Sequence, residues 1–426
     1  MRSSSSIYDF AAWTQLIPES EIRRLLRYNV RYYFAGGKPG KIPIEAMAKI
    51  LIEIGQEQLG MLEEGRYEEA LEQYNYGPTE GIPALREVLA KRMKEKDGIE
   101  VDPGDLVITS GSQQALYAIL DTLIDKGDVI MVSSPAYLGF VMPAVKLGAR
   151  IVIVPSDREG IIPEYIDEAF EAAVKELGKK PEILYLIPDS NNPTGSTLPE
   201  KRRKQVFDIC AEKEILIIED AAYREMQFTE SRLPPLKAYD RDNQYVAYIR
   251  SSSKEAAPLR IGYILVPTPV REQVIKAKGY YDLCSSTLVQ YILARYYSKY
   301  IDKYLPEILA EYKKRCDALK KAMDESFPTG WRTDPTGGFF IWWESERKDF
   351  DSKRFLEEVA LKNDIIYVPS RAFYPPTGYQ YDPSSRKLSP SCPKSNGMRL
   401  CFVYKPPEVL TEGALKLGRL LSQHLS

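Results

Sequence analysis

Lys254 lies in a run of serines, with Ser251 and Ser253 before it and Arg260 six residues after it. Hydroxyl and guanidinium groups around one lysine suit a ligand that carries a phosphate group. A lysine amine is also an effective nucleophile and base when it is neutral. Taken alone, these residues are more typical of a solvated basic loop. Their significance depends on which other groups the fold brings to the same place.

A second possible phosphate site follows the apolar run 106–109. Gly111, Ser112 and Gln113 come next and precede a helical pattern over 115–125. Small residues at the first turn of a helix allow backbone N–H groups to surround a phosphate. The same arrangement is more often an ordinary turn and helix cap, so it is weak evidence by itself.

Two more polar groups follow apolar runs. Asn192 belongs to an NPTG sequence after 183–187, and Asp220 and Tyr223 follow 215–218. Ligands of open α/β sheets bind at the carboxyl ends of the strands, which is where these side chains are expected. A simple turn also explains NPTG, and an acid three residues before a tyrosine is unremarkable alone.

The elements that must position these groups alternate between short apolar runs and amphipathic helices, a pattern typical of a parallel sheet covered by helices. The runs are nearly uninterrupted, as expected for strands buried on both faces: 106–109, 129–132, 151–154, 183–187, 215–218 and 245–249. Beyond a helical stretch, further strands are predicted at 338–343, 365–369 and 398–404. We expect an α/β fold with a mostly parallel central sheet and helices on both faces, plus a smaller α+β domain.

The predicted domain organisation has three parts. Residues 1–50, with a helix over 19–28, form an N-terminal arm and part of the small domain; 51–300 form a large domain and 301–426 a C-terminal small domain. The stretch 374–396 is rich in Pro, Ser and Gly and has no periodicity, so we expect a long loop there. The sequence leaves open whether this loop closes over a substrate.

The composition excludes several classes of function. The 426 residues include 58 Lys and Arg and 60 Asp and Glu, and this net charge of −2 gives no general attraction to nucleic acid or to an anionic membrane. The one histidine, His424, excludes His-based catalytic triads, and five cysteines without CxxC spacing argue against zinc and disulfides. The N-terminus lacks the apolar stretch of a secretory signal. We therefore expect a cytoplasmic protein with small-molecule substrates and no metal.

The chain resembles the class I and II aminotransferases in four motifs that occur in the same order: the glycine-serine turn, NPTG, DxxY, and SxSK with a downstream arginine. Members of this family are fold-type I enzymes that depend on pyridoxal 5′-phosphate (PLP). The sequence YNYGPTEGIPALR over 74–86, together with Gly36 and Gly37, extends the resemblance over nearly the whole chain. Within the family, the chain resembles the branch of kynurenine, 2-aminoadipate and aromatic aminotransferases.

The resemblance implies a role for each matching residue near the cofactor ring. Lys254 would form a Schiff base with the cofactor aldehyde and later move a proton between the substrate Cα and the cofactor. Asp220 would pair with the pyridine nitrogen and keep it protonated, which makes the ring an electron sink. Asn192 and Tyr223 would hydrogen-bond the phenolic oxygen, and Tyr137 would stack on the ring. Lys254, Asp220 and Tyr223 are thus the implied catalytic residues.

The resemblance also implies which groups bind the cofactor phosphate. These are hydroxyl, amide and guanidinium side chains of one subunit, joined by a tyrosine of a second subunit in a homodimer: Ser112, Gln113, Ser251, Ser253, Arg260 and Tyr76. The six-residue step from Lys254 to Arg260 is about one residue shorter than is usual in the family. The phosphate contact of Arg260 is therefore the implied contact that most needs a structural test.

The implied substrate site uses residues from both ends of the chain. Arg399, in the segment NGMRL, would bind the substrate α-carboxylate in bidentate fashion. Gly37, Asn192 and Arg23 would complete the site. An arginine at the start of a strand can equally be a surface residue, so the assignment of Arg399 depends on the upstream motifs.

The resemblance implies an aminotransferase that moves an amino group from an L-amino acid to a 2-oxo acid such as 2-oxoglutarate by a ping-pong mechanism. The donor would be aromatic, 2-aminoadipate-like or drawn from a broad range. A carbon–sulfur β-lyase on the same fold is an alternative that would use the same motifs. A non-enzymatic PLP-binding regulator is another, but the motifs begin by Gly36 and leave little room for a DNA-binding module of about 60 residues.

Overall fold

A nine-stranded sheet runs through the centre of the computed structural model, which describes residues 8–425 apart from 18, 26 and 231. The order across the sheet is β16 (Lys387–Pro390), β15 (Tyr379–Asp382), β4 (Arg150–Val154), β3 (Val129–Ser133), β7 (Pro181–Leu186), β8 (Leu216–Asp220), β9 (Val246–Ser251), β10 (Gly262–Leu265) and β2 (Val107–Thr109). In this order, the six strands from β15 to β9 are parallel, whereas β10 is antiparallel to both neighbours and β16 is antiparallel to β15. The six runs predicted as strands of this sheet are confirmed.

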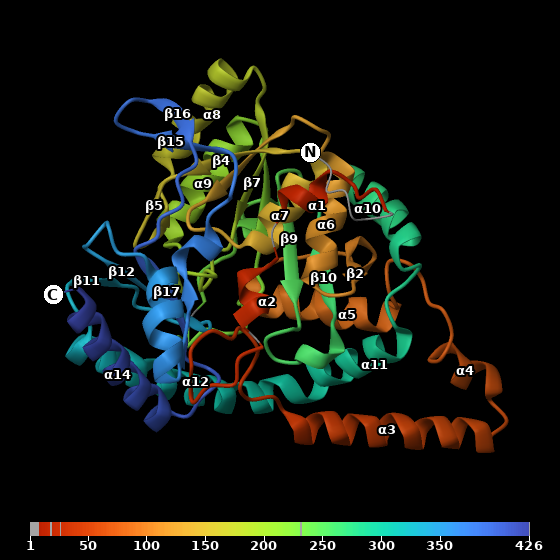
Figure 1. The fold of residues 1–426 in the computed structure, drawn as a ribbon. Coiled ribbons are helices and arrows are strands. Elements are labelled where there is room, and N and C mark those ends of the chain that lie inside the picture. Colours follow the sequence, from red (N-terminus) through yellow and green to blue (C-terminus); the bar gives the residue numbers. More distant parts are fainter. Residues whose placement is uncertain (1–7, 18, 26, 231, 426) are drawn as a thin grey trace.

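Helices cover both faces of the sheet (Figure 1). Side chains alternate along each strand, so Ile183 and Tyr185 of β7 pack in one hydrophobic cluster and Leu184 and Leu186 in another. The first cluster includes side chains of α6 (Ser112–Leu123), α7 (Leu138–Leu147) and α10 (Thr268–Tyr281). The second includes side chains of α8 (Glu164–Leu177) and α9 (Glu200–Glu212). The central strands are buried on both faces for this reason.

A smaller antiparallel sheet lies beside the first, in the order β11 (Gly330–Arg332), β12 (Phe340–Ser345), β17 (Gly397–Cys401) and β14 (Val368–Pro369). The long helices α12 (Ile301–Ser326) and α14 (Pro407–Leu425) pack against each other next to it (Figure 1). The predicted smaller α+β unit is therefore present. The short strands β5 (Ser156–Asp157) and β6 (Gly160–Ile161) pair separately.

The N-terminal residues join the C-terminal part of the chain. β1 (Tyr32–Tyr33) pairs in parallel with β13 (Ile365–Ile366). Short helices α1 (Trp13–Leu16) and α2 (Glu21–Leu25) precede it, and α2 is shorter than the helix predicted over 19–28. The remaining α-helices of the described residues are α3 (Ile44–Glu63), α4 (Tyr67–Glu72), α5 (Pro83–Arg92), α11 (Thr287–Arg295) and α13 (Ser352–Phe355). Helix α5 continues as a π-helical turn over Met93–Asp97.

The prediction that 374–396 is a loop was wrong for part of this stretch. β15 and β16 form a hairpin there, and β15 adds to the edge of the large sheet by pairing with β4. Tyr381 anchors the hairpin, since its ring is buried and its hydroxyl donates to Glu168 Oε2 at 2.7 Å. Each strand has only four residues, which is too short for an alternating pattern to emerge from the sequence.

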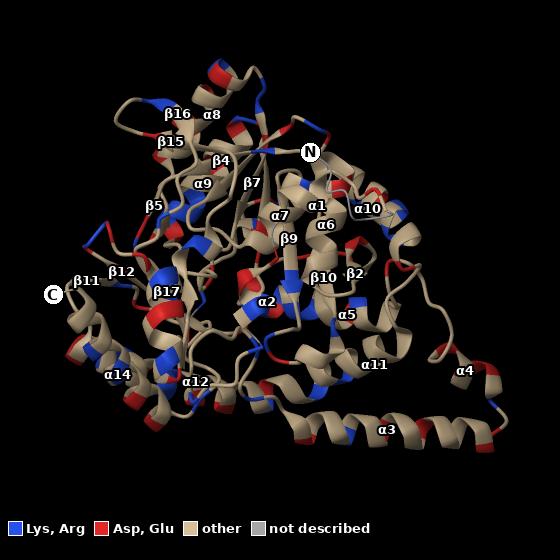
Figure 2. Cartoon of the chain, viewed as in Figure 1, with Lys and Arg blue, Asp and Glu red and all other residues tan. Residues whose placement is uncertain are grey.

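Charged groups are mixed over the elements. Figure 2 shows Lys and Arg interspersed with Asp and Glu along the visible helices. Within the described ranges of the chain, no helix is both long enough and apolar enough to cross a membrane.

Candidate active site

The amine of Lys254 lies beside two aromatic rings. Its Nζ is 4.9 Å from the centre of the Tyr223 ring and 5.8 Å from the centre of the Phe339 ring. Burial lowers the pKa of this amine to about 8, although the negative charge of Asp220 opposes the shift. A substantial fraction of the amine is therefore neutral near physiological pH, which is the form that reacts as a nucleophile or base.

Asp220 ends β8 and is buried with its oxygens in hydrogen bonds. The Tyr185 hydroxyl donates to Oδ2 at 2.9 Å, and the backbone N–H of Ala222 donates to Oδ1 at 3.2 Å. Burial raises the pKa of this carboxyl, and the two hydrogen bonds oppose that effect. Tyr223 is also buried, and burial raises its pKa, so its hydroxyl remains protonated.

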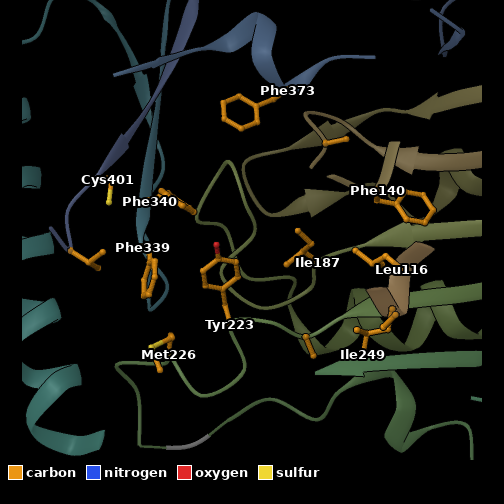
Figure 3. Packing of buried hydrophobic residues seen from close by; sticks show 14 of the residues in the cluster. Leu116, Phe140, Ile187, Tyr223, Met226, Ile249, Phe339, Phe340, Phe373 and Cys401 are labelled. Carbon is orange, nitrogen blue, oxygen red and sulfur yellow. The ribbon is translucent and has the colours of Figure 1, made fainter. Parts of the chain in front are cut away.

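Figure 3 shows how Tyr223 is held. It points up from its loop, with Phe339 and Phe340 at the start of β12 on one side and Ile187, just after β7, on the other. Its ring makes edge contacts with both phenylalanines, at 5.5 and 6.0 Å between ring centres. The residue therefore lies where the two sheets meet, close to Lys254.

Arg260 reaches the first turn of α6 despite the short loop before it. It adopts a left-handed conformation with φ of 53°, and a Cβ atom on Gly111 would lie only 2.8 Å from its Nη2. Gly262 also has to be glycine, because a Cβ there would lie 2.6 Å from the backbone nitrogen of Ser112. The guanidinium thus sits at the helix N-terminus where a phosphate would be expected.

The other residues of the predicted cofactor site lie around this turn. Ser251 Oγ donates to Ser253 Oγ at 2.9 Å, just before Lys254. Tyr137 donates to Oε1 of Gln113 at 3.2 Å and leans over Gly139, whose missing Cβ leaves room for the tyrosine ring. Ser112 is the first residue of α6. Ser251 pairs with Gly262, and Gly262 pairs with Thr109 just before this turn, so the structure brings the predicted phosphate ligands of these two segments together.

Arg399 is a buried arginine with two nitrogens fixed by the protein. Nη1 donates to Asn192 Oδ1 at 2.7 Å and Nη2 donates to the carbonyl oxygen of Ala35 at 2.9 Å, while Nε has no partner among the described residues. The guanidinium carbon lies 4.0 Å from the centre of the Phe340 ring and 5.0 Å from that of Phe373. Burial lowers the pKa of Arg399 to about 10, so it stays charged at neutral pH.

The three remaining predicted site residues are Gly37, which contacts a residue of the buried site directly, and Arg23 and Tyr76, which are exposed. Gly37 lies against Phe340, because a Cβ on it would come within 3.3 Å of that ring. Arg23 is exposed on α2, and its charge acts on Tyr137, whose pKa is raised mainly by burial. Tyr76 is 80% exposed, so within one chain it is not part of the buried site.

The sequence interpretation missed four residues that contact this site: Tyr185, Phe340, Phe373 and Ala35. Tyr185 gave a signal that could have been used, because it places a hydroxyl inside the apolar run 183–187 next to the strand that ends at Asp220. Ala35 contributes only its backbone carbonyl, and no pattern of residue types reveals such a contact.

A family model described as "Aminotransferase class I and II" matches residues 57–396. The chain belongs to this family. It is 34% identical over 414 residues to "Aromatic-amino-acid aminotransferase 1" of Thermococcus litoralis, covering 95% of this chain and 92% of that protein. It is 31% identical over 418 residues to "2-aminoadipate transaminase" of Thermus thermophilus, covering 95% and 94%.

Solved structures agree with this assignment. The crystal structure of the Pyrococcus horikoshii kynurenine aminotransferase, in complex with PMP and with KYN as substrate, superposes with a TM-score of 0.85 at 32% identity and 98% coverage of both chains. The protein is therefore a PLP-dependent transaminase of fold type I, as the motifs predicted. Its residues fit the cofactor: Gly111 and Arg260 leave a cradle for the phosphate, Asp220 offers a buried carboxylate, and Lys254 offers an amine.

Proposed function

We propose that the protein moves an amino group from an aromatic, 2-aminoadipate-like or broad range of L-amino acids to a 2-oxo acid such as 2-oxoglutarate, in two half-reactions at one site. The observation that carries the proposal is the position of Lys254. Its amine is partly neutral, lies 4.9 Å from the centre of the Tyr223 ring and interacts electrostatically with Asp220. When bound, PLP supplies an electrophilic carbon and an electron-withdrawing ring.

The side chains of the chain do the remaining work. Lys254 would hold the cofactor through its amine and, once an amino acid displaces it, would take the proton from the substrate Cα and deliver it to the cofactor carbon. Asp220 would keep a proton on the ring nitrogen. Tyr223 and Asn192 would donate to the phenolic oxygen of the cofactor. Asn192 suits this role because Arg399 occupies its Oδ1, which turns its amide NH₂ away from the arginine and leaves it available as a donor.

Arg399 binds the α-carboxylate of each substrate. Asn192 and Ala35 hold the guanidinium in one orientation, and two phenylalanine rings flank it, so little entropy is lost when a carboxylate binds. Gly37 lets the backbone approach the substrate. Arg23 is the candidate for a second, distal carboxylate, whereas the rings of Phe340 and Phe373 favour apolar or aromatic side chains.

The proposed working unit is a homodimer in which Tyr76 reaches the phosphate of the partner site. In one chain its side chain is 80% exposed. Helix α3, earlier in the chain, exposes a series of large apolar residues that a second copy would cover: Ile44, Leu51, Ile52, Leu59 and Leu62. Exposed apolar area of this kind marks a protein interface.

A substrate screen tests the proposal. Purified holoenzyme is given single L-amino acids, and the visible spectrum is followed for conversion of the aldehyde form of the cofactor to the amine form; 2-oxoglutarate should reverse it. Fast conversion with aromatic amino acids or 2-aminoadipate is expected. Release of pyruvate and ammonia from S-substituted cysteines without the amine form would instead support the β-lyase alternative. Absence of both the spectral conversion and pyruvate release with all donors would contradict both enzymatic functions.

A further inference from the structure

Tyr185 contacts Asp220 directly from the neighbouring strand. Its hydroxyl lies 2.9 Å from Oδ2. On β7 it pairs with Ile218 of β8, and Ile218 and Asp220 share one face of β8 because side chains alternate along a strand. Tyr185 and Asp220 therefore lie on the same face of the sheet, with Tyr185 opposite the residue two positions before Asp220. Its ring extends along this face so that the hydroxyl reaches the carboxylate.

The ring of Tyr185 is held rigidly. It stacks on Phe140 of α7 with 4.0 Å between ring centres and 6° between the ring planes, and both side chains are buried. Burial also raises the pKa of Tyr185 well above its usual value. The hydroxyl therefore keeps its proton over the whole physiological range and acts as a fixed donor to Asp220.

Asp220 needs such a donor. A carboxylate buried in an apolar environment tends to take up a proton, and burial is the largest influence on the pKa of Asp220, raising it. The hydrogen bond from Tyr185 is the main opposing effect, followed by the N–H of Ala222 and the charge of Lys254. A neutral Asp220 would no longer favour a proton on the ring nitrogen.

We infer that Tyr185 is a positioning residue that acts through Asp220: its hydroxyl orients the carboxylate and keeps it ionised, so that the pyridine nitrogen of PLP stays protonated. The inference rests on the proposed role of Asp220. It requires no contact between Tyr185 and the cofactor.

The test compares two ligands of the apoprotein. PLP has a ring nitrogen, whereas 1-deazapyridoxal 5′-phosphate has a C–H group in its place and cannot use Asp220. In Tyr185→Phe the dissociation constant of PLP should rise about 10-fold, as expected for loss of a hydrogen bond to a charged group. The dissociation constant of the deaza ligand should be equal in wild type and variant. Equal weakening of both ligands, or no change in either, would overturn the inference.

Tyr248→Phe is the matched control. Tyr248 is also fully buried, and its hydroxyl donates to another buried carboxylate, that of Asp97, at 3.2 Å. This variant loses the same kind of bond away from Asp220, so its affinity for PLP should be unchanged. A loss equal to that of Tyr185→Phe would assign the effect to general destabilisation and refute the inference.

The ¹⁵N chemical shift of labelled PLP in the holoenzyme gives a second measurement. It should move toward that of unprotonated pyridine in Tyr185→Phe and stay unchanged in Tyr248→Phe. Asp220→Asn separates this inference from the proposed function. If Asp220→Asn does not weaken PLP relative to the deaza ligand, the proposed role of Asp220 fails. If it does and Tyr185→Phe has no effect, only the inference about Tyr185 fails.

Discussion

Nη1 of Arg399 lies 2.7 Å from Oδ1 of Asn192, and this hydrogen bond joins the two sheets. Arg399 lies on β17 of the small sheet, whereas Asn192 follows β7 of the large sheet. The bond thus fixes the proposed carboxylate ligand relative to the groups that surround the cofactor. The carbonyl oxygen of Ala35, 2.9 Å from Nη2, fixes it from the N-terminal segment as well.

Arg399→Lys should mainly affect substrate binding. The change keeps the positive charge but removes the planar pair of donors, so KM for the amino acid should rise roughly 10- to 100-fold, as expected for a lost hydrogen bond between charged groups. Steady-state kinetics with both half-reaction substrates measures this. Arg347→Lys is the control, because Arg347 is a surface arginine paired with Asp349. Equal KM values for Arg399→Lys and wild type would contradict the carboxylate role.

Lys254→Met should change the stability of the apoprotein in a pH-dependent way. Burial lowers the pKa of Lys254 from 10.5 to about 8, so below pH 8 the folded protein holds a charge that the site disfavours. Met removes that charge, and the variant should be more stable than wild type at pH 7. Between pH 8 and 10.5 the wild-type lysine is neutral when folded and charged when unfolded, so wild-type stability rises and the advantage disappears.

Urea unfolding of both apoproteins at a series of pH values measures this difference. Lys321→Met, on the exposed side of α12, is the control and should show no such trend. An advantage of Lys254→Met that stays constant from pH 7 to 10.5 would mean that the lysine has an ordinary pKa.

Much of the fold was predictable because burial on both faces leaves a clear pattern. β3 and β9 consist of buried residues only, and apolar runs of this kind are recognisable without knowledge of their neighbours. The polar residues after such strands were predictable for the same reason, because the carboxyl ends of parallel strands share one edge. Asn192, Asp220 and Lys254 were found in this way.

Contacts between distant segments were not predictable. The rings of Phe340 and Phe373 beside Arg399 are brought there by the packing of β12 and the turn after β14, which no local pattern of residue types reveals. The hairpin of β15 and β16 is stabilised by contacts with distant segments, namely the pairing of β15 with β4 and the hydrogen bond of Tyr381 to Glu168. The left-handed conformation of Arg260, which compensates for the short loop, is likewise imposed by tertiary structure.

Arg260→Ala should weaken PLP binding through the phosphate group alone. The guanidinium lies against Gly111 at the N-terminus of α6, so its removal should raise the dissociation constant of PLP roughly 10- to 100-fold. Pyridoxal, which lacks the phosphate, should bind equally to both proteins. Arg241→Ala, at an exposed position, is the control. Weakening of both ligands would show that Arg260 supports the fold rather than the phosphate.

Arg23→Gln should change the choice of donor. If Arg23 binds a distal carboxylate, kcat/KM for 2-aminoadipate should fall roughly 10-fold while that for phenylalanine stays constant. Competition between the two donors in one reaction measures the ratio. Arg27→Gln is the control, since Arg27 is exposed two residues beyond the end of α2 and pairs with Glu19. A parallel loss for both donors would argue against a selectivity role.

Two inactive variants should restore activity when they share a dimer. Tyr76→Ala would damage the partner's site and Lys254→Ala its own, so a mixed dimer has one site with both defects and one intact site. With random pairing, half of the dimers are mixed and about a quarter of the wild-type activity should return. Co-expression with two affinity tags isolates the mixed dimer. Lys254→Ala with Asp220→Ala is the control, because both changes affect the chain's own site and no intact site can form. Mixed dimers of Tyr76→Ala and Lys254→Ala without activity would rule out a shared site.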